Sequence, residues 1–122
     1  MPHNTLMRHT FRKSERLCSR KAVEALFAAG SRGFTVWPIR TVWRESEETQ
    51  ILIVVPKRRL HHAVDRNRAK RQLREAYRLQ KDIIANIATP RHIALLWIAD
   101  TLVPTARVMQ SVARILHHIA ES

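Results

Sequence analysis

The feature that most constrains the fold of this chain is a pair of apolar runs separated by a long helical stretch. Residues 50–55 and 91–99 are rich in Ile, Leu and Val, a composition typical of buried strands. Between them, residues 65–87 have helical periodicity, with Asp65 as the expected N-cap and Pro90 beyond the break. Strand, helix and strand in this order generally give two parallel strands, with the helix packed on one face of their sheet.

Two further helices are expected on either side of this unit. The first covers residues 20–29, with Ser19 as its N-cap and Gly30 as the residue that stops it. The second begins at Thr105, which we expect to cap it. Its apolar residues repeat at the spacing of one buried helix face, at Val108, Val112, Ile115, Leu116 and Ile119.

A further strand is expected over residues 34–44, where Trp37, Ile39, Thr41 and Trp43 share one face. Pro38 lies inside this segment, which indicates an edge position or a bulge because proline cannot donate to a strand ladder. Residues 45–49 are polar and predict a turn. We therefore expect residues 34–44 to pair antiparallel with residues 50–55, which we place at the centre of the sheet.

The expected order α-β-β-α-β-α defines an α+β fold, a single-domain α/β sandwich in which helices pack on a mixed sheet. The chain has 122 residues, of which 45% are hydrophobic, so it suits one domain with a modest core. We assign residues 15–122 to this single α+β domain. Residues 1–14 lack periodicity and carry several cations, which predicts either a flexible basic arm or a frayed terminus without a role.

The charge of the chain indicates the class of its partner. Lys and Arg number 22 against 10 Asp and Glu, which gives a formal net charge of +12. Such a chain attracts polyanions, and no apolar run approaches the roughly 20 residues of a membrane span, so nucleic acid is favoured over membrane. Cys18 is the single cysteine and no secretory signal is evident, which predicts a cytoplasmic protein.

Residues 66–80 concentrate this charge on one side of the expected helix. At about 100° per residue, one stripe is apolar and should pack on the sheet. This stripe is Ala69, Leu73, Ala76 and Tyr77. The adjoining arc holds Arg66, Asn67, Lys70, Arg71, Arg74 and Arg78. Cations four residues apart repel each other, and Glu75, the one acid of the stretch, falls outside the arc. Phosphate groups would relieve this repulsion, because arginine grips phosphate with two parallel hydrogen bonds.

Three other classes of protein compete with a specific RNA-binding role. A ribosomal or other structured-RNA-binding protein fits the composition equally well. A DNA-binding regulator would need base-reading side chains near the helix N-terminus, whereas this helix presents mostly phosphate-binding cations. A protein-only nuclease would need a cluster of acids for its metal ions, and the sequence has none. A solvated charged face without a partner is the remaining interpretation.

The start of this helix resembles the signature of the bacterial ribonuclease P protein family. The motif is Arg66-Asn67-Arg68-Ala69-Lys70-Arg71, with Arg74 one turn later. The resemblance extends to residues 52–58, a strand that ends in two basic residues, to the Arg-Leu, Phe and Gly pattern of residues 16–30, and to the last strand. The chain departs from the family pattern at Val23, Leu52, Val54 and Pro56. We therefore expect the leader-binding surface to differ in detail.

This resemblance implies a function and a fold. In the family an RNA is the catalyst, and the protein assists the metal-dependent endonucleolytic removal of the 5′ leader from precursor tRNA. The implied partners are ribonuclease P RNA, with one protein per RNA, and precursor tRNA, with no membrane and no small-molecule substrate. The implied cofactor is Mg²⁺ held by the RNA and its substrate. The implied fold is that of the second domain of ribosomal protein S5. No catalytic or metal-binding residue is expected in the protein itself.

The resemblance also assigns two sets of site residues. The residues expected to bind the catalytic RNA are Arg66, Asn67, Arg68, Lys70, Arg71, Arg74, Arg78, Lys57 and Arg58. On the helical wheel, Arg68 points away from the others. The residues expected to bind the single-stranded leader, in a cleft between the first helix and the sheet, are Phe27, Val23 and Trp37. Aromatic rings stack on bases of any sequence, but the helical spacing of Phe27 also fits a core position.

Overall fold

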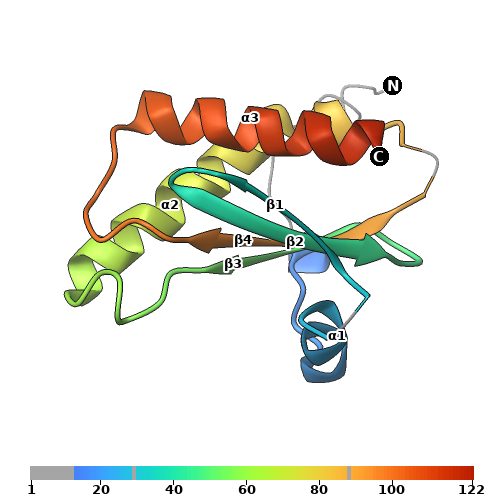
Figure 1. The fold of residues 1–122 in the computed structure, drawn as a ribbon, viewed down its shortest axis with the longest axis horizontal. Helices are drawn as coiled ribbons and strands as arrows, with labels where there is room; N and C mark the ends of the chain where they lie inside the picture. Colours follow the sequence, from blue (N-terminus) through green and yellow to red (C-terminus); the bar gives the residue numbers. More distant parts are fainter. Residues whose placement is uncertain (1–12, 29, 88) are drawn as a thin grey trace.

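The computed structural model describes residues 13–28, 30–87 and 89–122. Helices lie on both faces of one mixed sheet, which confirms the predicted α+β class. Helices α2 (Ala63–Gln80) and α3 (Thr105–Glu121) cover one face, and the short helix α1 (Arg20–Leu26) crosses the other (Figure 1). The strands are β1 (Arg32–Val36), β2 (Ile39–Glu45), β3 (Gln50–Val54) and β4 (Arg91–Trp97).

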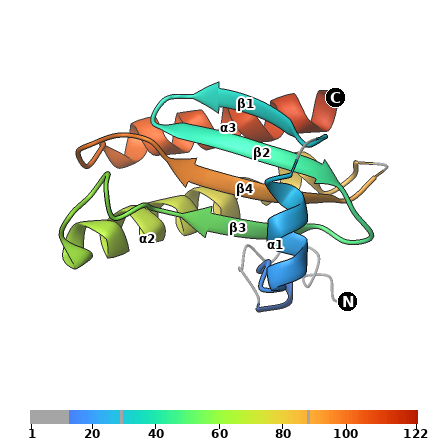
Figure 2. The same cartoon turned by 60° about the horizontal axis from the view of Figure 1, so that its bottom comes forward.

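The sheet has the strand order β1-β2-β4-β3, which Figure 2 shows from the side of α1. β3 pairs with β4 in parallel, and α2 connects them, so the predicted strand–helix–strand unit is confirmed. Two other expectations were wrong. β3 lies at an edge of the sheet, and it does not pair with β2, because β4 inserts between them and pairs antiparallel with β2.

The single strand expected over residues 34–44 is a hairpin. β1 and β2 pair antiparallel with Val36 opposite Ile39, and Trp37 and Pro38 form the turn between them. A turn suits Pro38, since it has no N–H to give to the ladder. The predicted alternation holds within β2, where Ile39, Thr41 and Trp43 are buried. The order of helices and strands along the chain is as predicted, except that the first predicted strand is a hairpin of two strands.

Two apolar cores hold these layers together. The larger lies between the sheet and helices α2 and α3, and it includes the apolar stripes predicted for both helices. The smaller lies under α1 and consists of Leu17, Leu26 and Ala94, with partly buried residues around them. The Nη1 of Arg44, on β2, donates a 2.7 Å hydrogen bond to the carbonyl oxygen of Ala25. This bond fixes the C-terminal turn of α1 to the sheet.

The first helix has the expected cap but a shorter length. The hydroxyl of Ser19 accepts a 3.3 Å hydrogen bond from the N–H of Ala22, as an N-cap does. The helix ends at Leu26, before the expected end at residue 29, and Gly30 lies in the following turn with a φ of 102°. That conformation favours glycine, so Gly30 turns the chain into β1.

The caps expected for the other two helices were wrong. α2 begins two residues before Asp65, with His62 at its N-cap position, and Asp65 lies in its first turn. α2 ends at Gln80, where a 3-10 helix, Lys81–Ile84, continues the chain. Thr105 is the first residue of α3, and Pro104 holds its N-cap position. Residues 1–12 of the predicted basic arm lie outside the described residues.

Leu26 is fully buried and anchors α1 to the sheet. We expect Leu26→Ala to lower the free energy of unfolding by about 2–5 kcal/mol, because it leaves a cavity in the smaller core. Urea denaturation followed by circular dichroism measures this loss. Leu79→Ala is the matched control, since Leu79 on α2 is 45% exposed and should lose less than about 1 kcal/mol. Equal losses in the two variants would contradict this packing of α1.

Candidate RNA-binding surface

Helix α2 presents a basic face whose direction is fixed by packing. Its predicted stripe, Ala69, Leu73, Ala76 and Tyr77, is buried, and the helix packs on β3 and α3. A helix anchored in this way cannot rotate about its axis, so its remaining side chains are held toward solvent. Asn67, Arg68, Arg71 and Arg74 are exposed, while Arg66, Lys70 and Arg78 are partly buried. Lys57 and Arg58, in the preceding loop, are also exposed.

Arg66 has a structural role that the sequence did not indicate. Its Nη1 donates hydrogen bonds to the carbonyl oxygens of Leu60 and His61, both at 2.9 Å. These bonds close the loop of residues 57–62 onto the first turn of α2. Arg66 therefore ties the loop that carries Lys57, Arg58 and Arg59 to the start of α2.

Arg78 is paired with the one acid of this stretch. Its Nε and Nη2 donate to the two carboxylate oxygens of Glu75 at 2.9 and 2.8 Å. These hydrogen bonds lower the pKa of the Glu75 carboxyl, so the pair stays ionised at neutral pH. The expectation of a basic face without a compensating acid was wrong at this end of the helix.

The other exposed cations carry no such partner. Among the described residues, Lys57, Arg58, Arg68, Arg71 and Arg74 form no ion pair with an acid. They are long, charged side chains on one rigid helix and the loop fastened to it. The arrangement can hold the phosphate backbone of a nucleic acid along the length of the helix.

The basic surface continues past the edge of the sheet. A cavity of about 170 Å³ lies beside β3, and both Arg74 and Arg16 line it. The segment carrying Arg16 is fixed by a 2.9 Å hydrogen bond from the N–H of Leu17 to the carbonyl oxygen of Ile51. Sequence reasoning did not assign Arg16 to the site, although its place in the Arg-Leu pattern was a signal. Arg16 lies in the short segment that leads into α1.

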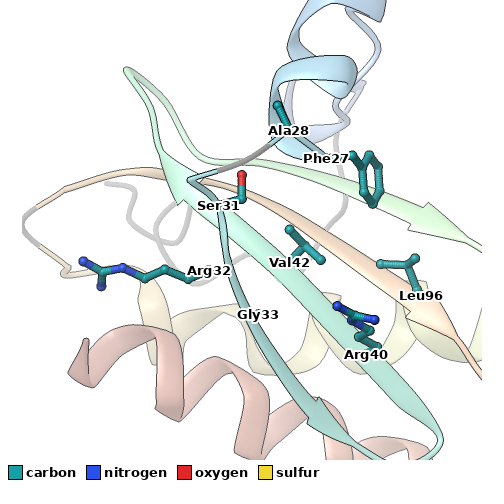
Figure 3. A pocket seen from close by; sticks show the side chains of 8 residues that line it. All are labelled: Phe27, Ala28, Ser31, Arg32, Gly33, Arg40, Val42 and Leu96. Atoms are coloured by element: carbon teal, nitrogen blue, oxygen red, sulfur yellow. The ribbon is translucent and has the colours of Figure 1, made fainter.

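A cleft of about 320 Å³ lies between the end of α1 and the open face of the sheet (Figure 3). Its lining residues are Phe27, Ala28, Ser31, Arg32, Gly33, Arg40, Val42 and Leu96. Phe27 is 46% exposed, because Leu26 takes the core position, and Figure 3 shows its ring above Leu96. Val42 and Leu96 give the cleft an apolar floor, and Arg40 gives it a cation. Arg40 was not predicted as a site residue, although the alternation along β2 placed it on this face.

The other two residues expected in the cleft are not among those that line it. Val23 packs in the smaller core under α1. Trp37 lies in the β1–β2 turn against α3, where its carbonyl oxygen accepts hydrogen bonds from Arg107 and Ser111. Its ring is 49% exposed and lies 5.7 Å from the guanidinium carbon of Arg107. Of the predicted leader-binding residues, the structure places Phe27 in the cleft.

The described residues show neither a cluster of metal ligands nor a membrane-spanning helix. They contain no group of three or more histidine, cysteine, aspartate or glutamate side chains arranged to hold a metal ion. In the same ranges, none of the helices combines the length and the apolar character that crossing a membrane requires.

The chain is similar to proteins of a known family. The family model for Ribonuclease P matches residues 11–119. The ribonuclease P protein component of Porphyromonas gingivalis is 36% identical over 117 residues, covering 88% of this chain and 85% of the relative. That of Chlorobium phaeobacteroides is 30% identical over 129 residues, covering 91% of this chain and 88% of the relative.

Solved structures share the fold. The RNase P protein from Thermotoga maritima superposes with a TM-score of 0.70 at 21% identity, covering 85% of this chain and 96% of that one. The Staphylococcus aureus RNase P protein gives 0.71 at 18% identity, covering 88% and 96%. The family model spans nearly the whole chain, and the two ribonuclease P protein components match the chain over most of their own lengths. The chain therefore belongs to the ribonuclease P protein family.

Proposed function

We propose that this protein acts as the protein component of ribonuclease P in the cytoplasm. It binds the catalytic RNA through the basic face of α2 and the 5′ leader of precursor tRNA through the cleft beside α1. It thereby assists the removal of the leader that gives mature tRNA 5′ ends. The observation that carries this proposal is the set of exposed cations on α2 and its loop, which have no acid partner among the described residues.

The energetics favour a polyanion at this face. Arg71 and Arg74 are exposed on α2, Lys57 and Arg58 are exposed in the loop before it, and each cation that meets a phosphate releases condensed counterions from the RNA. Their direction is set before binding, because the stripe of α2 is buried and Arg66 fastens the loop. The backbone therefore needs little further ordering when the RNA binds.

The cleft suits a single strand of variable sequence. Phe27 offers half of its ring for stacking on a base, Val42 and Leu96 form the floor, and Arg40 is available for a phosphate. Arg16, beside Arg74, lies between the basic face of α2 and the start of α1. This continuity would let one protein hold the catalytic RNA and the leader together, with one protein per RNA.

The chemistry of hydrolysis is assigned to the RNA. We propose that Mg²⁺ is held by the RNA and its substrate; among the described residues, no group of three or more His, Cys, Asp or Glu side chains is arranged to hold a metal ion. The bound cation would activate water and stabilise the leaving oxygen. The protein's own residues position the strands and lower the repulsion between their phosphates. No small-molecule substrate and no membrane partner enter this function.

The direct test is reconstitution with a bacterial ribonuclease P RNA. We expect the protein to raise the rate of precursor tRNA cleavage at low Mg²⁺, because its cations replace part of the metal that screens the phosphates. Cleavage of a 5′-labelled precursor measures the rate. A tRNA with a mature 5′ end, which lacks the leader, is the control for the contribution of the leader to binding. If the protein bound structured RNAs of any kind equally and gave no increase over the RNA alone, a general RNA-binding protein would be the better assignment.

The basic face is tested by the salt dependence of RNA binding. We expect Arg71→Ala combined with Arg74→Ala to flatten the plot of log affinity against log salt by about one unit per lost phosphate contact. Filter binding at several salt concentrations measures the slope. Arg114→Ala on α3 is the control, since this arginine is exposed on another helix. An unchanged slope in the double variant would show that the face is merely solvated.

The pair of Glu75 and Arg78 allows a test in the opposite direction. We expect Glu75→Gln to steepen the same slope by up to about one unit, because it frees the guanidinium of Arg78 for a phosphate. We expect Arg78→Ala to have less effect than Arg71→Ala, because its charge is already balanced. A larger change of slope for Arg78→Ala than for Arg71→Ala would place the RNA along a different arc of α2.

The cleft is tested with the leader alone. We expect Phe27→Ala to weaken binding of a single-stranded leader by about 1–3 kcal/mol, because a base loses its stacking partner. Fluorescence anisotropy of a labelled leader measures the affinity, and Phe27→Tyr should retain it. Trp37→Ala is the control, since Trp37 lies at the β1–β2 turn against α3. A larger loss for Trp37→Ala than for Phe27→Ala would move the leader to the side of α3.

A further inference from the structure

The segment that precedes α1 is fastened to the end of α2 by an ion pair, and the proposed function gives this pair no role. The Nζ of Lys81 lies 3.0 Å from each carboxylate oxygen of Glu15. The Lys81 side chain is 18% exposed and that of Glu15 is 23% exposed, so water screens this pair less than a pair at the surface. We propose that Glu15 is a positioning residue for RNA binding, which holds Arg16 at the cavity that Arg74 also lines.

The chain is fixed on both sides of Arg16. Arg16 itself forms an isolated parallel bridge with Ile51 at the outer edge of β3, where Figure 2 shows the segment before α1 in dark blue. After it, Leu17 is buried in the smaller core, and its N–H donates a 2.9 Å hydrogen bond to the carbonyl oxygen of Ile51. Before it, Glu15 is tied to Lys81. The ion pair therefore holds the N-terminal side of Arg16 on the domain.

A second bond on this N-terminal side is weaker. The Nε2 of Gln50 donates a 3.2 Å hydrogen bond to the main-chain oxygen of Ser14, and this bond is exposed and joins two uncharged groups. Hydrogen bonds between ionised groups are roughly twice as strong as neutral ones. Loss of the Glu15 carboxylate should therefore loosen the chain at Arg16 more than loss of the Gln50 amide does.

Glu15 and Arg16 reach one side of α2 at two levels. Lys81 follows Arg74 by seven positions, about two helical turns, so both lie on the same side of the helix. Tyr77 lies between them and is buried. Burial, and then the nearby Glu15 carboxylate, raise the pKa of the Tyr77 hydroxyl, so Glu15 lies close to the packed side of α2. Glu15 thus faces the helix, while Arg16 stays exposed beside β3.

The positioning role of Glu15 predicts an effect opposite in sign to its charge. The chain has a formal net charge of +12, so removing one acid should by itself tighten the binding of a polyanion. Removing Glu15 also releases the chain that carries Arg16. An arginine on a loose segment loses more conformational freedom when it binds a phosphate, and this cost weakens binding. We expect the second effect to be larger, because the freed ammonium of Lys81 is mostly covered by protein.

This role of Glu15 rests on the proposed function, because it concerns the RNA that the basic face of α2 binds. The two can fail separately. Reconstitution with the unmodified protein tests the function, whereas the role of Glu15 is tested by comparing variants of a protein that binds. An unmodified protein that does not bind ribonuclease P RNA would refute both.

Filter binding to a bacterial ribonuclease P RNA at one salt concentration tests the sign of the effect. We expect Glu15→Gln to weaken binding by about three- to tenfold. Glu75→Gln is the matched control, because it removes a carboxylate from the pair with Arg78, and it should bind at least as tightly as the unmodified protein. Binding by Glu15→Gln that equals or exceeds that of the unmodified protein overturns the positioning role.

Dependence on Arg16 separates positioning from a general loss of stability. In a protein that already carries Arg16→Gln, the further change Glu15→Gln should weaken binding no more, because the arginine that Glu15 positions is absent. Circular dichroism shows that each variant is folded. Equal weakening by Glu15→Gln in the presence and in the absence of Arg16 would overturn the positioning role.

A charge swap keeps the ion pair while it changes both residues. We expect Glu15→Lys combined with Lys81→Glu to bind RNA within about twofold of the unmodified protein, because the swapped pair fastens the same segment. We expect Glu15→Lys alone to bind more weakly than the unmodified protein, although it adds a cation, because its ammonium repels Lys81. Tighter binding by this single variant, or a swapped protein that binds no better than it, would overturn the role of Glu15.

Discussion

The burial of β4 is the interaction on which the rest of this structure depends. β4 is hydrogen-bonded on both sides, to β2 and to β3, and it is covered on both faces. Ile93, Leu95 and Trp97 enter the larger core, while Ala94 enters the smaller one. A strand that is apolar on both faces exposes the least apolar surface to water when it occupies the centre of a covered sheet. Its position forces the order of the other strands and brings the helices to their two faces.

The functional surface depends on this core through the fixed rotation of α2. Four buried side chains of α2 lock its angle, so the cations on the adjoining positions are held in a row before any RNA arrives. The fold then modifies the row. Arg66 is used to fasten a loop, and Arg78 is neutralised by Glu75. Fewer cations are left exposed on α2 than the helical wheel suggests, and the fastened loop adds its exposed Lys57 and Arg58.

The opposite face of the sheet is covered only in part, and that incomplete cover leaves a cleft. α1 is seven residues long and spans one end of the sheet, where Leu26 and the bond from Arg44 hold it. Beyond its last turn, Phe27 and the outward residues of β2 border a cleft. Arg44 also lines a smaller cavity, together with Gly30 and Arg91.

The sequence by itself determined what depends on local periodicity and on motif. The stripe of α2, the stripe of α3, the alternation along β2 and the parallel β3–β4 pair were all predicted, because each follows from residues close together or from a constrained connection. The family motif at the start of α2 was also identified from the sequence. Tertiary structure alone decided the β1–β2 hairpin, the edge position of β3, the exposure of Phe27 and the partners of Arg66 and Trp37. These features depend on contacts between segments that are distant in sequence. Several arrangements have similar local propensities, and burial and hydrogen-bond geometry between the segments determine which one forms.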